Sequence, residues 1–307
     1  MRIAIMGAGA LGGYFGARLH QAGQDVILIA RGAHLDAIRN GGLYVDSPNG
    51  NAHLTDILAT NDPSTVGTVD CVLFFVKNYD LAAAVQQALP MIGQDSFAAT
   101  FQNGITAPDV VADTIGADRV LGGAAWIPGY ISAPGHIKHT DTKDTLSFGA
   151  LSSAGLAHQN RLFDALTAAG TRPERVDDIE LALWRKFVML SATSAVSSLT
   201  RLTFGEINQV PQTLDLMRRA LAEAALVARA IRPDLPKTLS EDQFAFYQTI
   251  NGQVRASMCT DILSGRKLEL DWFSGEITRK AREHGIATPV HDVALAALWP
   301  YRDGAVG

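Results

Sequence analysis

The sequence predicts an α/β protein with a Rossmann-type, doubly wound parallel sheet, an antiparallel extension of that sheet, and an all-helical C-terminal domain. Three observations predict this fold. Strand-like and helical segments alternate from residue 2 to residue 104, a glycine-rich loop follows the first strand, and no convincing strand occurs after Asp178. Strands that alternate with helices form parallel sheets covered by helices on both faces, and such strands are apolar almost throughout.

The expected elements follow in chain order. Strands are expected at 2–7, 24–31, 70–77 and 96–104, with helices at 11–23 and 79–93. Short strands separated by Pro-Gly and Asp/Thr turns are expected within 120–131, 135–140 and 145–151. Helices dominate from there, at 179–200, 211–231, 240–263 and 268–284. Each helical segment has apolar residues at helical spacing, and the last ends at a glycine stop signal.

The chain is long enough for two domains with separate cores, since it has 307 residues. The stretch "RPERVDDIE" has the character of a hinge, and Asp177 and Glu180 are spaced as an Asp version of a capping box. We therefore expect a Rossmann-type domain at 1–177 and a helical domain at 178–307.

Composition excludes several classes of function. The net charge is −5 and there is no long basic run, which argues against nucleic acid as a partner. No apolar stretch is long enough to span a membrane, and the N-terminus does not look like a signal peptide, so a cytoplasmic location is expected. Cys71 and Cys259 lie in apolar surroundings and are expected to be reduced core thiols. His136 and His139 are expected on a surface turn, and no metal site is expected.

The stretch "IAIMGAGALGGYFG" contains Gly7, Gly9 and Gly12 in the pattern G-x-G-x-x-G. The pattern is weak alone, but here it directly follows a strand and opens a helix. Gly7 would make the tight turn, Gly9 would let the backbone approach a pyrophosphate, and Gly12 would let helix and strand pack closely. The sequence therefore predicts a dinucleotide site at the N-terminus of the first helix.

The residues at the end of the second strand indicate which dinucleotide is bound. An NAD site usually carries an acidic residue there, but "VILIARG" places Ala30 and Arg31 at this point. An arginine suits a 2′-phosphate, so we expect NADP; a solvated surface arginine is the alternative. Lys77 and Asn103 end two further strands and are expected on the same sheet edge, although each could also be an exposed loop residue.

Lys186 is an unusual charge in the stretch "LALWRKFVMLSATSAVSSLTRL". The apolar residues occur on nearly every face, so the helix is expected to be buried on most sides, where an ammonium is costly unless it is paired or used. Reduction of a ketone needs an acid for the forming alkoxide, and a lysine facing an interdomain cleft could supply it. The alternative is that Lys186 extends to solvent from the first turns of the helix.

A second group of polar residues occurs in "RASMCTDILSGRKLELDWFSGEI". Ser257 and Asp261 are four residues apart and are expected on one helical face. Glu269 is expected to open the next helix, where an acid complements the helix dipole. A charged partner for Lys186 would most naturally come from this segment.

The chain resembles the ketopantoate reductase (2-dehydropantoate 2-reductase) family, of the 6-phosphogluconate dehydrogenase-like superfamily, over essentially its whole length. The resemblance rests on "GAGALGGYFG", "VK" at 76–77, "QNG" at 102–104, "PGHIKH", "LWRK" at 183–186, "SMCTDILSGRKLELD" and "HGIATPV". It implies hydride transfer from NADPH to the C2 ketone of ketopantoate, which yields pantoate for coenzyme A synthesis. Members of this superfamily often dimerise through the helical domain.

The resemblance also implies roles for individual residues. Lys186 would be the general acid, Glu269 would lie beside it and the nicotinamide ribose, and Ser257 would bind the substrate carboxylate. Asn103 would contact both cofactor and substrate, and Ser194 is expected on the lysine side of its helix as a further substrate contact. The cofactor would be held by Gly7, Ala8, Gly9, Ala10, Leu11, Gly12, Arg31, Lys77, Asn103 and the backbone of Ile127.

The sequence departs from the family at the residues that contact the substrate. Leu190, Ser194 and Phe204 stand where well-studied members have asparagines. Loss of one hydrogen bond to a buried substrate oxygen typically costs about 1–3 kcal/mol. Hydroxyls of Ser191, Thr193 or Ser197 could substitute only where they face the cleft. A different, more apolar 2-oxo acid is therefore an alternative substrate, and a non-catalytic sensor of NADPH is an alternative function.

Overall fold

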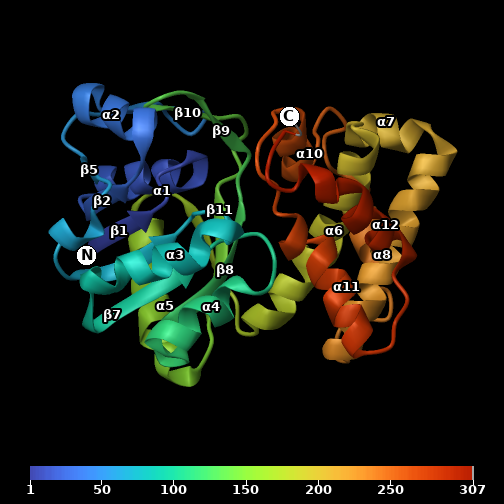
Figure 1. The fold of residues 1–307 in the computed structure, drawn as a ribbon. Helices are drawn as coiled ribbons and strands as arrows, with labels where there is room; N and C mark the ends of the chain where they lie inside the picture. Colours follow the sequence, from blue (N-terminus) through green and yellow to red (C-terminus); the bar gives the residue numbers. More distant parts are fainter. Residues whose placement is uncertain (306–307) are drawn as a thin grey trace. The chain divides into compact units, whose positions relative to one another are not determined.

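The computed structural model describes residues 1–305, which divide into two compact units (Figure 1). Unit 1 is Met1–Ile179 and unit 2 begins at Glu180. The division lies two residues beyond the boundary expected after residue 177. In the part of the chain described, no helix is both long and apolar enough to cross a membrane.

Unit 1 is built on an eight-stranded sheet with the order β12-β11-β8-β7-β6-β1-β2-β5. Adjacent strands from β8 to β5 are parallel, β11 is antiparallel to β8, and β12 is parallel to β11. The strands are β1 (Arg2–Met6), β2 (Asp25–Ile29), β5 (Leu58–Thr60), β6 (Val69–Phe74), β7 (Ile92–Thr100), β8 (Val120–Trp126), β11 (Thr145–Ala150) and β12 (Arg172–Arg175). The predicted Rossmann-type sheet is thus confirmed.

Helices cover both faces of this sheet because its strands are apolar on both sides. In β1, Ile3 and Ile5 belong to one buried cluster, whereas Ala4 and Met6 belong to another. The first cluster contains residues of α1, α2 and α5, and the second contains residues of α3 and α4. These helices are α1 (Ala10–Gln21), α2 (Gly32–Gly41), α3 (Asn78–Ala88), α4 (Ala107–Ile115) and α5 (Leu156–Ala168).

A separate four-stranded sheet corrects the expected antiparallel extension. β8 and β11 do extend the main sheet, but β9 (Gly129–Ala133) and β10 (His136–His139) pair in the order β4-β3-β10-β9. Their partners β3 (Leu43–Asp46) and β4 (Ala52–Leu54) were not expected from the sequence. This sheet packs on α1, and a Cβ on Gly13 would lie 2.3 Å from the Ile137 side chain.

Two further expectations for unit 1 were wrong. Residues 172–175 of the expected hinge form β12, because their backbone pairs with β11. His136 and His139 lie in strand β10 rather than a turn. The first is exposed, and the second is buried with its Nδ1 2.8 Å from the hydroxyl of Ser47. Both cysteines are buried and free, as expected.

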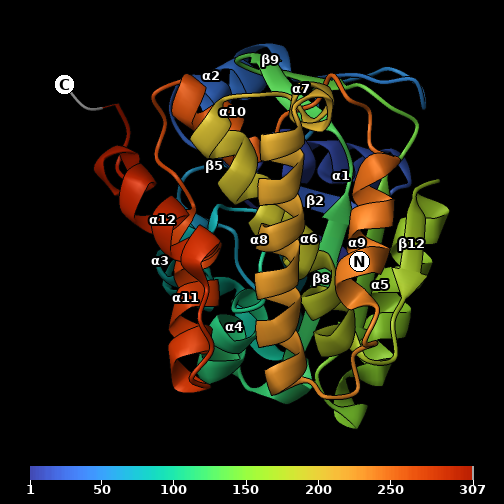
Figure 2. The ribbon, with the colours of Figure 1, turned by 90° about the vertical axis from the view of Figure 1, so that its right-hand side faces the viewer.

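Unit 2 is helical, and no strand occurs among its residues up to 305. Its helices are α6 (Ile179–Thr200), which starts at the unit boundary, α7 (Phe204–Gln209), α8 (Pro211–Ile231), α9 (Leu239–Gln248), α10 (Ser257–Leu263), α11 (Ser274–Glu283) and α12 (Pro289–Leu298). The long helix α8 contacts α7, α9, α11 and α12, and it runs between α9 on one side and α11 and α12 on the other (Figure 2).

Two of the expected helices in unit 2 were wrong in extent. The segment 240–263 forms two helices, because residues 249–256 are held by the start of α7: Phe204 N donates to Val254 O and Gly205 N to Gly252 O. The segment 268–284 begins with a 3-10 turn, η5 (Leu270–Trp272), and α11 starts only at Ser274. Glu269 therefore precedes a short turn rather than an α-helix.

A buried histidine makes the stability of unit 2 dependent on pH. The His291 ring has its Nε2 3.1 Å from Ala220 O and its Nδ1 3.3 Å from the Ser274 hydroxyl, and burial lowers its pKa from 6.5 to about 4. The unfolded chain therefore binds a proton below pH 6.5 that the folded chain binds only near pH 4. We expect this ring alone to lower the free energy of unfolding by about 3 kcal/mol between pH 7.5 and pH 4.

Urea unfolding at several pH values tests this expectation. In His291→Gln the part of the pH dependence that arises from this ring should disappear, whereas His284→Gln, at an exposed site, should leave the slope unchanged. Glu223, which accepts from the backbone N–H groups of Val290 and His291, has a pKa raised by burial, so its contribution has the opposite sign. An identical slope in wild type and His291→Gln would contradict the assignment.

Candidate active site

The sequence-predicted cofactor residues of unit 1 lie along one edge of the main sheet. β8, β7, β6, β1 and β2 are neighbours and parallel, so their carboxyl ends share that edge. Each of these strands is followed by a predicted cofactor residue: in the same order, these are Ile127, Asn103, Lys77, the loop Gly7–Gly12 and Arg31. The carboxyl edge is where open α/β sheets bind ligands.

The glycine loop is held tightly between its two neighbouring strands. Gly7 has a φ of +96°, and a Cβ there would lie 2.8 Å from the Val76 backbone nitrogen. On the other side, the backbone N–H groups of Gly7 and Ala8 both donate to Ile29 O. A Cβ on Gly12 would lie only 2.2 Å from Gly7 O, so this position admits no side chain without a shift of the loop.

The N-terminus of α1 fits the phosphates of a dinucleotide. Gly9 is the N-cap residue, no side chain caps the helix, and its first turn carries no acid. A Cβ on Gly9 would meet nothing within 4 Å, so the space beside this helix end is open. The first N–H groups of a helix lack intrahelical partners and attract anions. Of the three loop glycines, Gly7 and Gly12 thus serve the fold, while Gly9 leaves room for a ligand.

Hydrogen bonds join the loops that carry Lys77 and Asn103. Lys77 is the N-cap residue of α3, and the side-chain amide of its neighbour Asn78 donates to Asn103 O over 2.7 Å. The Gln102 amide donates to Phe74 O and Val76 O. These hydrogen bonds therefore connect the two loops to each other beside the glycine loop.

Arg31 reaches across this edge toward α3. It is the N-cap residue of α2, and its Nη2 donates to Asp80 Oδ2 over 2.8 Å. The arginine side chain is 80% exposed and that of the aspartate 36% exposed. Because β1 lies between β2 and β6 in the sheet, the pair spans the carboxyl end of β1.

His34 supports the glycine loop and was not singled out from the sequence. Its Nδ1 accepts from Gly135 N over 3.0 Å, so its Nε2 carries the proton and donates to Ala8 O over 2.9 Å. Burial lowers the pKa of His34, which keeps the ring neutral and preserves both contacts at neutral pH. A histidine three residues after the expected ribose contact was the only sequence signal.

We expect His34→Ala to weaken dinucleotide binding at the loop several-fold and to lower stability by about 1–3 kcal/mol, because two buried backbone groups lose a partner. Thermal unfolding and equilibrium binding of NADPH test this. His20→Ala, in the last turn of α1, is the control, since that ring pairs with Asp56 in an exposed contact. Unchanged binding in His34→Ala would refute the supporting role.

Unit 2 carries the candidate catalytic groups. Lys186 is 8% exposed on α6 and Glu269 is 3% exposed just before η5. The rings of Phe187 and Phe273 are 6.4 Å apart, so the turn of α6 with Lys186 lies beside the segment that follows Glu269. On α10, Ser257 is exposed, and Asp261, one turn later, accepts from Arg266 Nε over 2.9 Å.

The three hydroxyl groups of α6 that were considered as substitutes for the missing amides bond to the backbone of unit 2. Ser191 donates to Val188 O, Thr193 to Met189 O and Ser197 to Leu202 O, each over 2.8 to 3.2 Å. Their protons are therefore already engaged. Ser194 is 2% exposed in the same helix.

Phe204 and Leu190 complete this region. The Phe204 ring is buried edge-on against Tyr247 at 5.3 Å. Leu190 is partly exposed on α6. Neither side chain can offer the hydrogen bonds of an amide.

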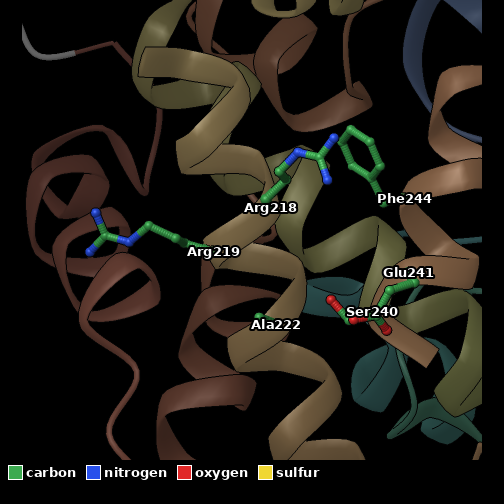
Figure 3. A pocket seen from close by; sticks show the side chains of 6 residues that line it. All are labelled: Arg218, Arg219, Ala222, Ser240, Glu241 and Phe244. Atoms are coloured by element: carbon green, nitrogen blue, oxygen red, sulfur yellow. The ribbon is translucent and has the colours of Figure 1, made fainter. Parts of the chain in front are cut away.

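A surface pocket of about 290 Å³ lies between α8 and α9, and none of its lining residues is predicted to bind cofactor or substrate (Figure 3). Its lining residues are Arg218, Arg219, Ala222, Ser240, Glu241 and Phe244. The Arg218 guanidinium stacks over the Phe244 ring at 3.8 Å, whereas Arg219 points to the other side of α8 (Figure 3). Across residues 1–305, no group of three or more His, Cys, Asp or Glu side chains could hold a metal ion.

Comparison with known families gives a match over most of the chain. The family model "Ketopantoate reductase PanE/ApbA" matches residues 3–153, and the model of the C-terminal domain of the same family matches residues 178–301. A 2-dehydropantoate 2-reductase of Mesorhizobium japonicum is 28% identical over 319 aligned positions, covering 97% of each chain.

Solved structures share the fold over the full length. A PanE/ApbA family ketopantoate reductase from Ralstonia eutropha is similar with a TM-score of 0.90 and 30% identity, covering 98% of both chains. A D-mandelate dehydrogenase, solved with NADH and anilino(oxo)acetate, is similar with a TM-score of 0.91 and 23% identity, again over 98% of both chains.

Proposed function

The chain belongs to the ketopantoate reductase family, and from that premise we propose that it reduces the C2 ketone of a 2-oxo acid with NADPH. The observation that carries the proposal is the buried lysine of α6. Lys186 is an ammonium on a largely apolar helix, beside the segment that follows the buried Glu269. A charge in such surroundings is costly unless it is paired or used, and general acid catalysis is a use that reduction of a ketone requires.

In the proposed reaction the cofactor supplies the hydride and the side chains supply the proton and bind the substrate. A nicotinamide cofactor supplies the hydride that forms the new C–H bond at C2 of the substrate. Lys186 Nζ gives the proton that forms the O–H bond as the carbonyl π bond breaks, so the products are a 2-hydroxy acid and the oxidised cofactor. Glu269 orients the ammonium, and Ser257 binds the substrate carboxylate. The amide of Asn103 contacts both cofactor and substrate.

The residues at the sheet edge support NADPH as the reductant. The open space at Gly9 and the uncapped start of α1 suit the pyrophosphate. Arg31 stands where an NAD site usually has an acid, and Lys77 at the start of α3 adds a second cation for the phosphates. The D-mandelate dehydrogenase of similar fold was solved with NADH, and a comparison of NADPH with NADH as the reductant tests the choice of cofactor.

The substrate is 2-dehydropantoate or a more apolar 2-oxo acid. Relatives that are 28% identical are 2-dehydropantoate 2-reductases, which favours the former, and with it a role in pantothenate synthesis in the cytoplasm. The bonded hydroxyls of α6, the buried Phe204 and the leucine at 190 favour the latter. An aryl oxo acid fits this second candidate, and the D-mandelate dehydrogenase structure contains anilino(oxo)acetate, an oxoacetate that carries an aryl amine. A homodimer through the helical unit is part of the proposal.

Oxidation of NADPH, followed by its absorbance, tests the proposal with 2-dehydropantoate and a panel of aliphatic and aryl 2-oxo acids. Turnover of 2-dehydropantoate with kcat/KM well above the panel would establish the first candidate. Preferred turnover of an apolar or aryl acid would establish the second. Binding of NADPH without turnover of any oxo acid would contradict the reductase proposal and leave an NADPH sensor.

A further inference from the structure

The ion pair between Arg31 and Asp80 joins two elements that flank the glycine loop. Arg31 precedes α2 at the end of β2, and Asp80 lies in the first turn of α3, with its backbone N–H donating to Lys77 O over 2.9 Å. The guanidinium Nη2 is 2.8 Å from Asp80 Oδ2. The Asp80 carboxylate therefore contacts Arg31, the side chain after the second strand that is expected to bind the ribose.

The position of this carboxylate matters because the residue after the second strand contacts the 2′ position of the adenosine ribose. A 2′-phosphate carries a charge of about −1.5 to −2 at neutral pH. It would have to compete with Asp80 for the Arg31 guanidinium and would be repelled by the carboxylate itself. A ribose 2′-hydroxyl is a donor, so it can bond to Asp80 while Arg31 keeps its partner.

The geometry points to Asp80 as a residue that determines cofactor specificity: it reduces the advantage of NADPH, so that the chain accepts NADH as well. This inference rests on the proposed function. It adds that the Asp80 carboxylate would bind the ribose, as an acid does in an NAD site. Here the acid comes from α3 rather than from the end of β2. Arg31 and Asp80 are both exposed enough to meet a ligand, and their pairing makes each available to one of the two cofactors.

The inference is tested with equilibrium dissociation constants for NADPH and NADH, measured by titration calorimetry on the full chain in the absence of substrate. We expect the two constants of the wild-type protein to lie within about tenfold of each other. Asp80→Asn should shift their ratio about tenfold toward NADPH at low ionic strength, because it removes one unit of like charge near the phosphate. The shift should shrink at about 1 M salt, where surface charges are screened.

Matched variants separate a local charge effect from a structural one. Asp80→Glu keeps the carboxylate and should retain most of the wild-type ratio. Asp113→Asn removes an exposed carboxylate from the end of α4 and should change neither constant. In an Arg31→Ala background, Asp80→Asn should have a smaller effect, because no cation remains to be released.

The outcomes for the two proposals are distinguishable. A wild-type chain that binds neither NADPH nor NADH would overturn the proposed function. A chain that binds NADPH with an unchanged ratio in Asp80→Asn would overturn only the role of Asp80, as would a wild-type preference for NADPH of more than a hundredfold. The role of Asp80 is supported if the ratio of the two dissociation constants shifts toward NADPH in Asp80→Asn but not in Asp80→Glu or Asp113→Asn.

Discussion

Replacement of Lys186 by alanine should lower kcat by about 10²–10⁴-fold with little change in NADPH affinity. The size follows from the usual contribution of a positioned general acid. Lys186 lies on α6 in unit 2, whereas the residues expected to hold the cofactor phosphates follow strands of unit 1. Loss of the ammonium should therefore remove the proton that the alkoxide needs and leave the dinucleotide site intact.

The neighbouring residue provides the control for this prediction. Arg185 is exposed on the same helix turn, so Arg185→Ala removes a cation of similar size without touching the buried site and should keep kcat within about twofold. Added small primary amines should restore part of the activity of Lys186→Ala but not of a misfolded protein. A Lys186→Ala enzyme with near wild-type kcat would show that another group supplies the proton.

Gly9→Ala and Gly12→Ala should both weaken the affinity for the dinucleotide by at least about a hundredfold. Only Gly12→Ala should also destabilise the fold. A Cβ at Gly12 would meet Gly7 O at 2.2 Å and Ile5 Cγ2 at 2.9 Å, so helix and strand must separate. Forced overpacking of this kind costs about 1–3 kcal/mol or more. A Cβ at Gly9 meets no protein atom within 4 Å and would instead occupy the space of the phosphates.

Denaturant unfolding and NADPH titration of the same variants distinguish these effects. Gly41→Ala is the matched control, because nothing lies within 4 Å of a Cβ there and its φ is not in the left-handed region. That variant should bind NADPH normally and be as stable as the wild type or slightly more so. Normal NADPH binding by Gly9→Ala would mean that the dinucleotide does not approach α1 as proposed.

Local sequence patterns predicted several of the elements that pack by periodicity. The limits of α6 and α8 follow from long runs of apolar residues at helical spacing, and the first strand, loop and helix follow from apolar and glycine positions. Strands of three or four residues, such as β4 (Ala52–Leu54) and β12 (Arg172–Arg175), were missed. They exist because a partner strand pairs with them, and a segment that short has no period to detect.

The helix expected at 240–263 failed for a related reason. Its residues favour a helix locally, but the backbone hydrogen bond from Phe204 N to Val254 O joins segments 50 residues apart and interrupts it. α7 carries a detectable signal, since the Thr203 hydroxyl and the Glu206 carboxylate form a capping box.

The sequence by itself determined the doubly wound sheet, the glycine loop at its first strand, and Lys186 on a buried helix, because each rests on residues that are close in the chain. Only the tertiary structure decided which side chains meet at the sheet edge. Arg31 and Asp80 are 49 positions apart, and His34 joins Ala8 to Gly135, 101 positions from the histidine. Such contacts depend on strand order rather than on local spacing, so no pattern along the chain could reveal them.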